Sequence, residues 1–167
     1  MLQIFHSMKE LVFSQLMDVY EESNRLNGSE LYPNCSSFEQ LREAEQDFLN
    51  YLTSVFFRQE NSFYAIWKEN NKYVSALRVE PYADGILLCA LETAPKERHK
   101  GFAYALLLSV IEKMAKQGSG TIYSHVSKAN MASLNVHLKS GFAVLKDHAV
   151  YSDGSVVHNC YTLAYKY

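Results

Sequence analysis

The sequence predicts a single α+β domain in which helices flank a mixed β-sheet. The hydrophobic periodicity switches along the chain between the 3.6-residue spacing of amphipathic helices and the two-residue spacing of strands. The chain has 167 residues, the size of one domain with one substantial core. No internal repeat, linker or low-complexity tract interrupts residues 1–167, so we expect one domain over this whole range.

The expected elements are, in chain order, a strand over 2–5, a helix over 7–25, a loop over 27–34, a helix over 37–56, strands over 63–68, 73–79 and 87–92, a helix over 102–116, a strand over 121–126, a helix over 131–139, and strands over 142–150 and 156–165. Ser7 with Glu10 forms a capping-box pattern for the first helix. Gly, Pro and Asn mark the loop that follows, and Ser37 with Gln40 is expected to cap the second helix.

From residue 62 onward the hydrophobic period is two, which indicates strands. The two asparagines at 70 and 71 predict a hairpin turn between the first pair. Gly141 is a good stop for the short helix over 131–139. The last two strands alternate in polarity around Ser152-Asp153-Gly154-Ser155, which predicts a terminal hairpin.

The segment from Leu87 to Met114 carries the strongest functional signal. An apolar run predicts a buried strand, and it is followed by Pro95, a basic cluster and Gly101, after which a helix begins directly. The first N–H groups of a helix lack intrahelical partners and carry partial positive charge, so they attract anions. Lysine and arginine side chains in the cluster add charge for phosphate oxygens. The layout predicts a site for a phosphorylated ligand; the alternative is a solvated basic loop before a surface helix.

Two blocks of the sequence carry the motifs of a known family. Arg98-His99-Lys100-Gly101-Phe102-Ala103 resembles the R/Q-x-x-G-x-G/A loop that binds the pyrophosphate of acetyl-CoA in this family, the GNAT N-acetyltransferases. Asn130-Met131-Ala132-Ser133-Leu134-Asn135-Val136-His137-Leu138-Lys139-Ser140-Gly141-Phe142 resembles its N-x-x-A/S-x-x-h-Y-x-x-x-G-F segment, where h is apolar. Since both blocks occur in order, separated by one helix and one strand, the chain is identified as a member of this family from about residue 87 to 142.

The resemblance implies a GNAT-type sheet, mixed but mostly antiparallel, with two splayed parallel strands and about four flanking helices. The strands ending near Glu92 and Val126 would splay apart, and the pantetheine arm of acetyl-CoA would lie between them. The acceptor would enter from the other side, between the loop over 27–34 and the terminal hairpin. The cofactor-binding residues that the resemblance implies are Leu91, Thr93, Arg98, His99, Lys100, Gly101, Phe102, Ala103, Asn130 and Ser133. Asn130 and Ser133 also fit a local role at the start of a helix.

Two residues are candidates for proton transfer. Glu92 is the candidate base, because a carboxylate beside apolar neighbours can have a raised pKa; the alternative is that it points outward or holds a loop. His125, on the other splayed strand, is the reserve candidate. His137 occupies the position where the family usually has a tyrosine that protonates the departing thiolate, and an imidazolium could donate that proton. The alternative is that His137 only packs beneath the pantetheine and satisfies a backbone carbonyl.

The resemblance implies acetyl-CoA-dependent transfer of an acetyl group to a primary amine of a small molecule or amino acid, by direct attack in a ternary complex. The alternatives are a non-catalytic acyl-CoA sensor and an enzyme for longer acyl chains. The net charge of −2 gives no attraction to nucleic acid or to an anionic membrane. Three widely spaced cysteines favour the reduced cytoplasm. We expect no metal site, and the family resemblance is compatible with a homodimer.

Overall fold

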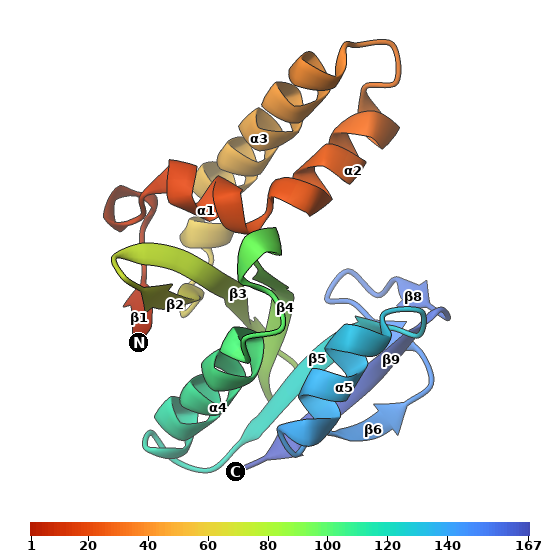
Figure 1. The fold of residues 1–167 in the computed structure, drawn as a ribbon. Helices are drawn as coiled ribbons and strands as arrows, with labels where there is room; N and C mark the ends of the chain where they lie inside the picture. The colour runs from red at the N-terminus through yellow and green to blue at the C-terminus, as the bar shows by residue number, and fades with distance from the viewer.

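The computed structural model describes residues 1–167 and places seven strands in one mixed sheet, in the order β1-β2-β3-β4-β5-β9-β6 (Figure 1). The strands of this sheet are β1 (Leu2–Phe5), β2 (Phe63–Glu69), β3 (Lys72–Tyr82), β4 (Gly85–Thr93), β5 (Thr121–Ser127), β6 (Ala143–Lys146) and β9 (Cys160–Lys166). The helices are α1 (Phe13–Val19), α2 (Glu21–Leu31), α3 (Ser37–Ser54), α4 (Phe102–Ala115) and α5 (Met131–Lys139). These strands and helices confirm the α+β class with a mixed sheet. None of the helices is long and apolar enough to cross a membrane.

The predicted pair of splayed parallel strands is β4 and β5. They pair only from Ile86 opposite Ile122 to Leu88 opposite Ser124, while every other neighbouring pair in the sheet is antiparallel. The close approach at the start of β4 requires glycine, because a Cβ atom on Gly85 would overlap the backbone carbonyl of Thr121. The two strands are thus closest at this end and separate towards their carboxyl ends.

The strands from β1 to β4 are covered on both faces. Along β2, Phe63 and Ala65 join the core that α4 covers, whereas Tyr64 and Ile66 join a second core under α1 and α3. This alternation follows from the two-residue period of a strand. The first core continues beneath β5, β9 and α5, so one apolar layer connects both halves of the sheet.

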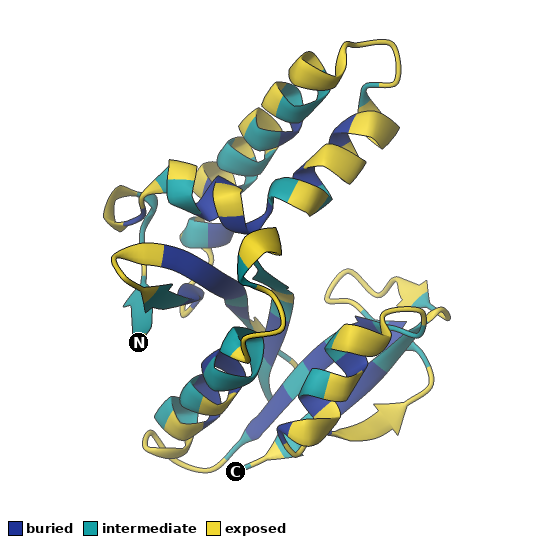
Figure 2. Ribbon diagram, viewed as in Figure 1, coloured by how far each residue is buried: buried dark blue, intermediate teal, exposed yellow.

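Helices α2 and α3 form an antiparallel arm that projects from the sheet, and most of its surface is exposed (Figures 1 and 2). Gly28 allows the two helices to touch, because a Cβ atom there would overlap the backbone carbonyl of Gln40. The capping box of α3 is Ser36 with Glu39, whose carboxylate accepts from the Ser36 N–H at 2.9 Å. The predicted box is therefore displaced by one residue.

The N-terminal helix differs most from its prediction. The expected helix over 7–25 is a 3-10 turn at Met8–Glu10, then α1, then a break at Tyr20 before α2. The Ser7 side chain makes no capping bond, and the Glu10 carboxylate instead accepts from the N–H of His6 at 2.8 Å. Dividing this segment yields five helices rather than four. Since α2 continues to Leu31, the predicted loop over 27–34 is mostly helix.

The predicted terminal hairpin forms as two short ladders. Strand β6 pairs with β9, with an irregularity between Val144 and Lys146, and the short strands β7 (Ala149–Val150) and β8 (Val156–Val157) pair with each other. The three cysteines are free thiols.

Candidate active site

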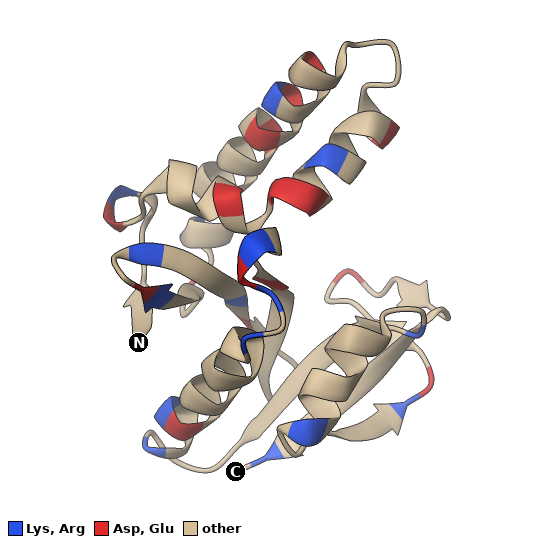
Figure 3. Ribbon diagram, viewed as in Figure 1, with Lys and Arg blue, Asp and Glu red and all other residues tan.

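The basic loop and the start of α4 form one end of the candidate site (Figure 3). Gly101 caps the helix with φ of +82°, a conformation that glycine adopts without cost, and its Cβ position is open space. The first intrahelical bond is donated by Ala105 to the Gly101 carbonyl at 2.9 Å. The N–H groups of Phe102, Ala103 and Tyr104 therefore have no partner within the helix. Open space beside free N–H groups is the arrangement that a phosphate group requires.

The basic side chains of this loop differ in how they are held. Arg98 donates from Nε to the Thr93 carbonyl at 3.2 Å and forms an ion pair with Glu22 of α2, so it ties the loop to β4 and to the arm. Lys100 pairs with Glu97 at 2.7 Å. His99 is exposed and has a positive φ of 63°. The loop is thus fixed mainly through its arginine.

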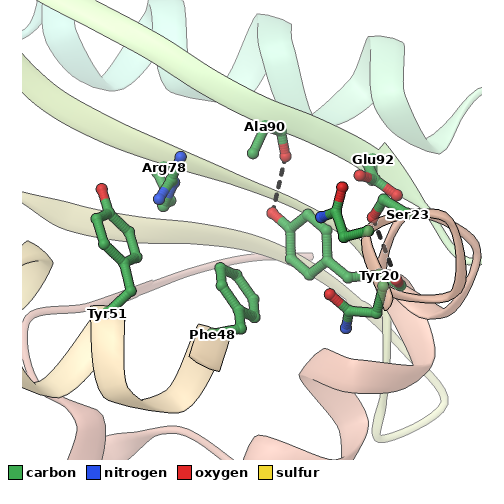
Figure 4. A pocket seen from close by; sticks show the side chains of 9 residues that line it. Tyr20, Ser23, Phe48, Tyr51, Arg78, Ala90 and Glu92 are labelled. Carbon is green, nitrogen blue, oxygen red and sulfur yellow. Dashed lines mark hydrogen bonds between the residues drawn. The ribbon is translucent and has the colours of Figure 1, made fainter. Parts of the chain in front are cut away.

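Strand β4 carries an extra residue just beyond its pairing with β5. Arg78 lies opposite Cys89 and Ala76 opposite Glu92, so two residues of β4 face Leu77 of β3. Ala90 in this bulge has φ of 51°, which is uncommon for a residue with a Cβ. The hydroxyl of Tyr20 donates to the Ala90 carbonyl at 2.8 Å (Figure 4). The break between α1 and α2 thus places a side chain that supports the bulge.

A cavity of about 450 Å³ lies between the arm and this part of the sheet (Figure 4). Its lining residues come from the α1–α2 break, α2, α3, β3 and β4, and they are Tyr20, Ser23, Asn24, Asn27, Phe48, Tyr51, Arg78, Ala90 and Glu92. Two of them are charged, one of each sign. Of the segment over 27–34 that was expected to form a wall, only Asn27 lines the cavity, and the rest of this wall comes from other residues of α2 and from α3.

Glu92, the candidate base, lies in this cavity and is half-buried. Burial raises the pKa of its carboxyl above the ordinary glutamate value, and the Ser23 hydroxyl and the charge of Arg98 offset part of that rise. The backbone carbonyl of Glu92 accepts from the Ser75 hydroxyl at 2.6 Å, which fixes the strand at this point. The Thr93 hydroxyl donates to Ser75 at 3.1 Å. Leu91 and Thr93 belong to the stretch of β4 that no longer pairs with β5.

The second motif forms the start of α5. The Asn130 side-chain oxygen accepts from the Ser133 N–H at 3.0 Å, which is the local capping role. His137 is only 1% exposed, and its Nδ1 lies 2.8 Å from the Ser133 carbonyl, which makes Nδ1 the protonated nitrogen. Its Nε2 is buried without a partner. Burial lowers the pKa of His137, and the bond to Ser133 offsets part of that shift. His137 is therefore neutral near pH 7.

His125, the reserve candidate, does not line the cavity. Its ring lies edge-on to those of Tyr82 and Tyr151, with centroids 5.4 and 4.9 Å away. Both ring nitrogens are buried without a hydrogen-bond partner, and burial lowers the pKa of the ring. The structure therefore places His125 in an aromatic cluster beside the candidate site.

Sequence reasoning missed several cavity residues, above all Phe48, Tyr51 and Arg78. The first two belong to the apolar face of α3, where the sequence indicates only core packing. Arg78 had a visible signal: it is the one charged residue between Tyr73 and Val79, in a strand that is otherwise apolar or small. A charge that interrupts such a strand must have a partner or face a site.

Comparison with known proteins agrees with this architecture. A family model described as "Acetyltransferase (GNAT) family" matches residues 16–142. The PaiA N-acetyltransferase of Thermoplasma acidophilum, solved in complex with coenzyme A, has a TM-score of 0.63 and 19% identity, with 100% of this chain and 99% of that chain covered. An aminoglycoside 6'-acetyltransferase of type Ii has a TM-score of 0.64 and 15% identity, with 99% and 96% covered.

A ribosomal-protein alanine N-acetyltransferase of Escherichia coli has a TM-score of 0.60 and 16% identity, with 99% of this chain and 94% of that chain covered. No curated protein sequence matches the chain. At these identities the solved structures show a common fold, and the family model covers most of the chain. The protein therefore belongs to the GNAT family of acetyltransferases.

Proposed function

We propose that this protein is an acetyl-CoA-dependent N-acetyltransferase that acts on a primary amine of a small molecule or an amino acid. The observation that carries the proposal is the combination of Gly101 with the split between β4 and β5. The first offers free N–H groups beside open space, and the second leaves the backbone of β4 beyond Leu88 without a strand partner on that side. A ligand in which a diphosphate is joined to an amide-containing arm suits both features, because the diphosphate can accept from the free N–H groups and the amides can pair with the backbone of β4.

Each part of the chain then has a defined role in binding. The N–H groups at the start of α4, with Lys100 and His99 beside them, hold the diphosphate. Backbone groups of Leu91 and Thr93 hold the pantetheine amides, and Asn130 and Ser133 orient the start of α5 beside it. Arg98 fixes the loop through Thr93 and Glu22. Acetyl-CoA supplies the activated acetyl group.

Glu92 acts as the base. The ammonium form of the acceptor must first lose a proton, because only a neutral amine is a nucleophile, and the carboxylate of Glu92 accepts this proton, directly or through a water molecule. The amine nitrogen then forms a bond to the acetyl carbon as the carbon–sulfur bond breaks. The nitrogen releases a second proton to solvent, and the thiolate gains one. The raised pKa of Glu92 supports its role, because a more basic carboxylate accepts a proton more readily.

For His137 the geometry favours packing over the acid role. A neutral imidazole whose one N–H is bound to the Ser133 carbonyl has no free proton to donate. We therefore propose that His137 holds the first turns of α5 in place beneath the pantetheine. The thiolate would then take its proton from solvent.

The experiment that tests the function is a calorimetric titration with acetyl-CoA of wild type, Gly101→Glu and the matched control Gly154→Glu. Gly154 has nearly the same φ, +84°, and open space around its Cβ position, but it lies in the terminal hairpin. Both variants carry the same backbone strain and the same added charge. We expect the first to lose binding and the second to bind as wild type does.

Turnover of a panel of primary amines then separates an enzyme from a sensor. Acetylation of any member supports the transferase. Tight acetyl-CoA binding with no turnover across the panel indicates the non-catalytic sensor instead. A folded wild type that does not bind acetyl-CoA would refute both.

A further inference from the structure

We propose that the acceptor is an amine that also carries a carboxylate, as amino acids do, and that Arg78 binds this carboxylate. The inference rests on the proposed function and names the class of acceptor that the cavity selects.

Arg78 lies on the acceptor face of the sheet. Its neighbours in β3, Leu77 and Val79, are buried in the core that α4 covers. Because side chains alternate along a strand, Arg78 points to the opposite face, towards the arm. There it forms part of the cavity wall together with Tyr51 and Phe48 (Figure 4).

The guanidinium of Arg78 has no hydrogen-bond partner in the protein. Its side chain is only 17% exposed, and the carboxylate of Glu80 lies 3.7 Å from Nε, beyond hydrogen-bond distance. The Nε atom is buried and unsatisfied. The two terminal nitrogens have no hydrogen-bond partner in the protein either, and the residue lines the cavity. Glu80 therefore offsets the charge of Arg78 as an ion pair, but the five N–H donors are left without an acceptor in a largely desolvated position. The cost of leaving them unsatisfied falls when a bound anion accepts from them.

The guanidinium is also held in place before any ligand binds. Its carbon lies 4.8 Å from the centroid of the Tyr51 ring and 5.7 Å from that of Phe56. Such stacking fixes the plane of the group. A planar fork of donors matches the two oxygens of a carboxylate, and a group that is already oriented loses little freedom on binding.

The other charged residue of the cavity is Glu92, which is negative and has a different role. Glu92, from β4, and Arg78, from β3, both line the cavity. In the proposed complex the first receives the ammonium and the second receives the carboxylate. A cavity with one charge of each sign complements a molecule with one charge of each sign. A simple amine would leave the hydrogen-bond donors of Arg78 unused, with only the ion pair to Glu80 at 3.7 Å to offset their desolvation. The cavity therefore selects zwitterionic acceptors over amines that lack an anion.

The test is a kinetic comparison of matched acceptor pairs, in which each L-amino acid is set beside the amine that remains when its carboxylate is removed. Phenylalanine with phenethylamine, and lysine with cadaverine, cover an aromatic and a cationic side chain. Wild type is compared with Arg78→Met, which keeps much of the side-chain length, with Arg78→Lys, which keeps the charge but loses the fork, and with Arg42→Met, a surface control on α3. Acetyl-CoA affinity is measured for every variant to confirm that each is folded.

We expect wild type to prefer an amino acid over its partner amine in kcat/KM. In Arg78→Met the KM for that amino acid should rise about 10- to 100-fold, the usual effect of losing a charged hydrogen-bonded pair, while the KM for the partner amine should change little. The KM of Arg78→Lys for the amino acid should lie between those of wild type and Arg78→Met. Arg42→Met should match wild type. Equal or better use of the decarboxylated amines by wild type would overturn the inference and leave the proposed function standing. No turnover of the amino acids or of the decarboxylated amines would overturn this inference and the proposed function together.

Discussion

At the scale of single residues, Glu92 shows how burial serves the proposed chemistry. Since burial raises its pKa, the carboxylate is a stronger base than an exposed glutamate and is protonated over a wider acidic range. We predict that Glu92→Gln lowers kcat about 10²- to 10⁴-fold, the usual contribution of a general base. The wild-type pH–rate profile should show an acidic limb above the ordinary glutamate range, and the variant should lack it. A variant that keeps both rate and profile would exclude Glu92 as the base.

The same substitution should not weaken the fold at neutral pH. A carboxyl whose pKa is raised on folding binds its proton more tightly in the native state, so this group lowers stability as the pH rises from the unfolded-state pKa to the folded one. Glu92→Gln should therefore be at least as resistant to urea as wild type at pH 7. The advantage should vanish below about pH 4, where both states are protonated. Loss of activity can then be assigned to chemistry.

The pKa of His137 shifts in the opposite direction to that of Glu92, so its effect on the pH dependence of stability is also opposite. Its pKa is lowered by burial, so the native state resists protonation and the protein loses stability as the pH falls through about 6.5, the unfolded-state value. We predict that His137→Gln reduces the difference in unfolding free energy between pH 7 and pH 5, measured by urea titration at each pH. A catalytic acid would instead move the pH profile of kcat, and we expect that profile to be unchanged in this variant.

Sequence reasoning could propose only those candidate residues that are defined by their spacing along the chain. Positions 98–103 and 130–142 take their shape from local turn and helix geometry, so their pattern is visible without a structure. Arg78 and Tyr20 enter the site only through tertiary contacts. The hydrogen bond from Tyr20 joins residues 70 positions apart, and no local pattern encodes it.

At the scale of elements, the bulge in β4 depends on a contact from outside the sheet. Tyr20 is 3% exposed, and its hydroxyl is bound to the carbonyl of Ala90. Removing the hydroxyl leaves a carbonyl without its partner, so we predict that Tyr20→Phe destabilises the protein by about 1–2 kcal/mol. Denaturant unfolding measures this. The control is Tyr32→Phe, which removes an exposed hydroxyl bonded to Asp47 and should cost less.

Element boundaries were the least predictable part of the fold. The capping box of α3 lies one residue before the predicted one because Ser36, Ser37, Glu39 and Gln40 offer two overlapping patterns with the same chemistry. At the N-terminus the pattern of Ser7 and Glu10 was wrong, since the carboxylate bonds to His6 instead. The strands of the central sheet were easier to predict, because they show either a two-residue hydrophobic period or, from Leu87, a continuous apolar run.

At the scale of the whole molecule, the candidate site depends on how the two halves of the sheet join. One core continues beneath both halves, while β4 and β5 share only three residue pairs. We predict that Gly85→Val, which forces apart the end where these strands are closest, weakens acetyl-CoA binding and destabilises the fold by about 1–3 kcal/mol. Calorimetry and denaturant unfolding measure the two effects. Gly118→Val, in an open loop position, should leave binding unchanged.

Gly85 lies where β4 and β5 are closest. A small displacement of the strands at this point should therefore produce a larger change in their separation towards their carboxyl ends. In a scan of substitutions scored by activity, this position should therefore rank with the residues that line the cavity, although Gly85 is not one of them. An unbiased screen for variants that accept other amines should then recover substitutions at Gly85 as well as in the cavity wall. Varying the residues around Gly85 offers a way to change the spacing of β4 and β5 without altering any residue that lines the cavity.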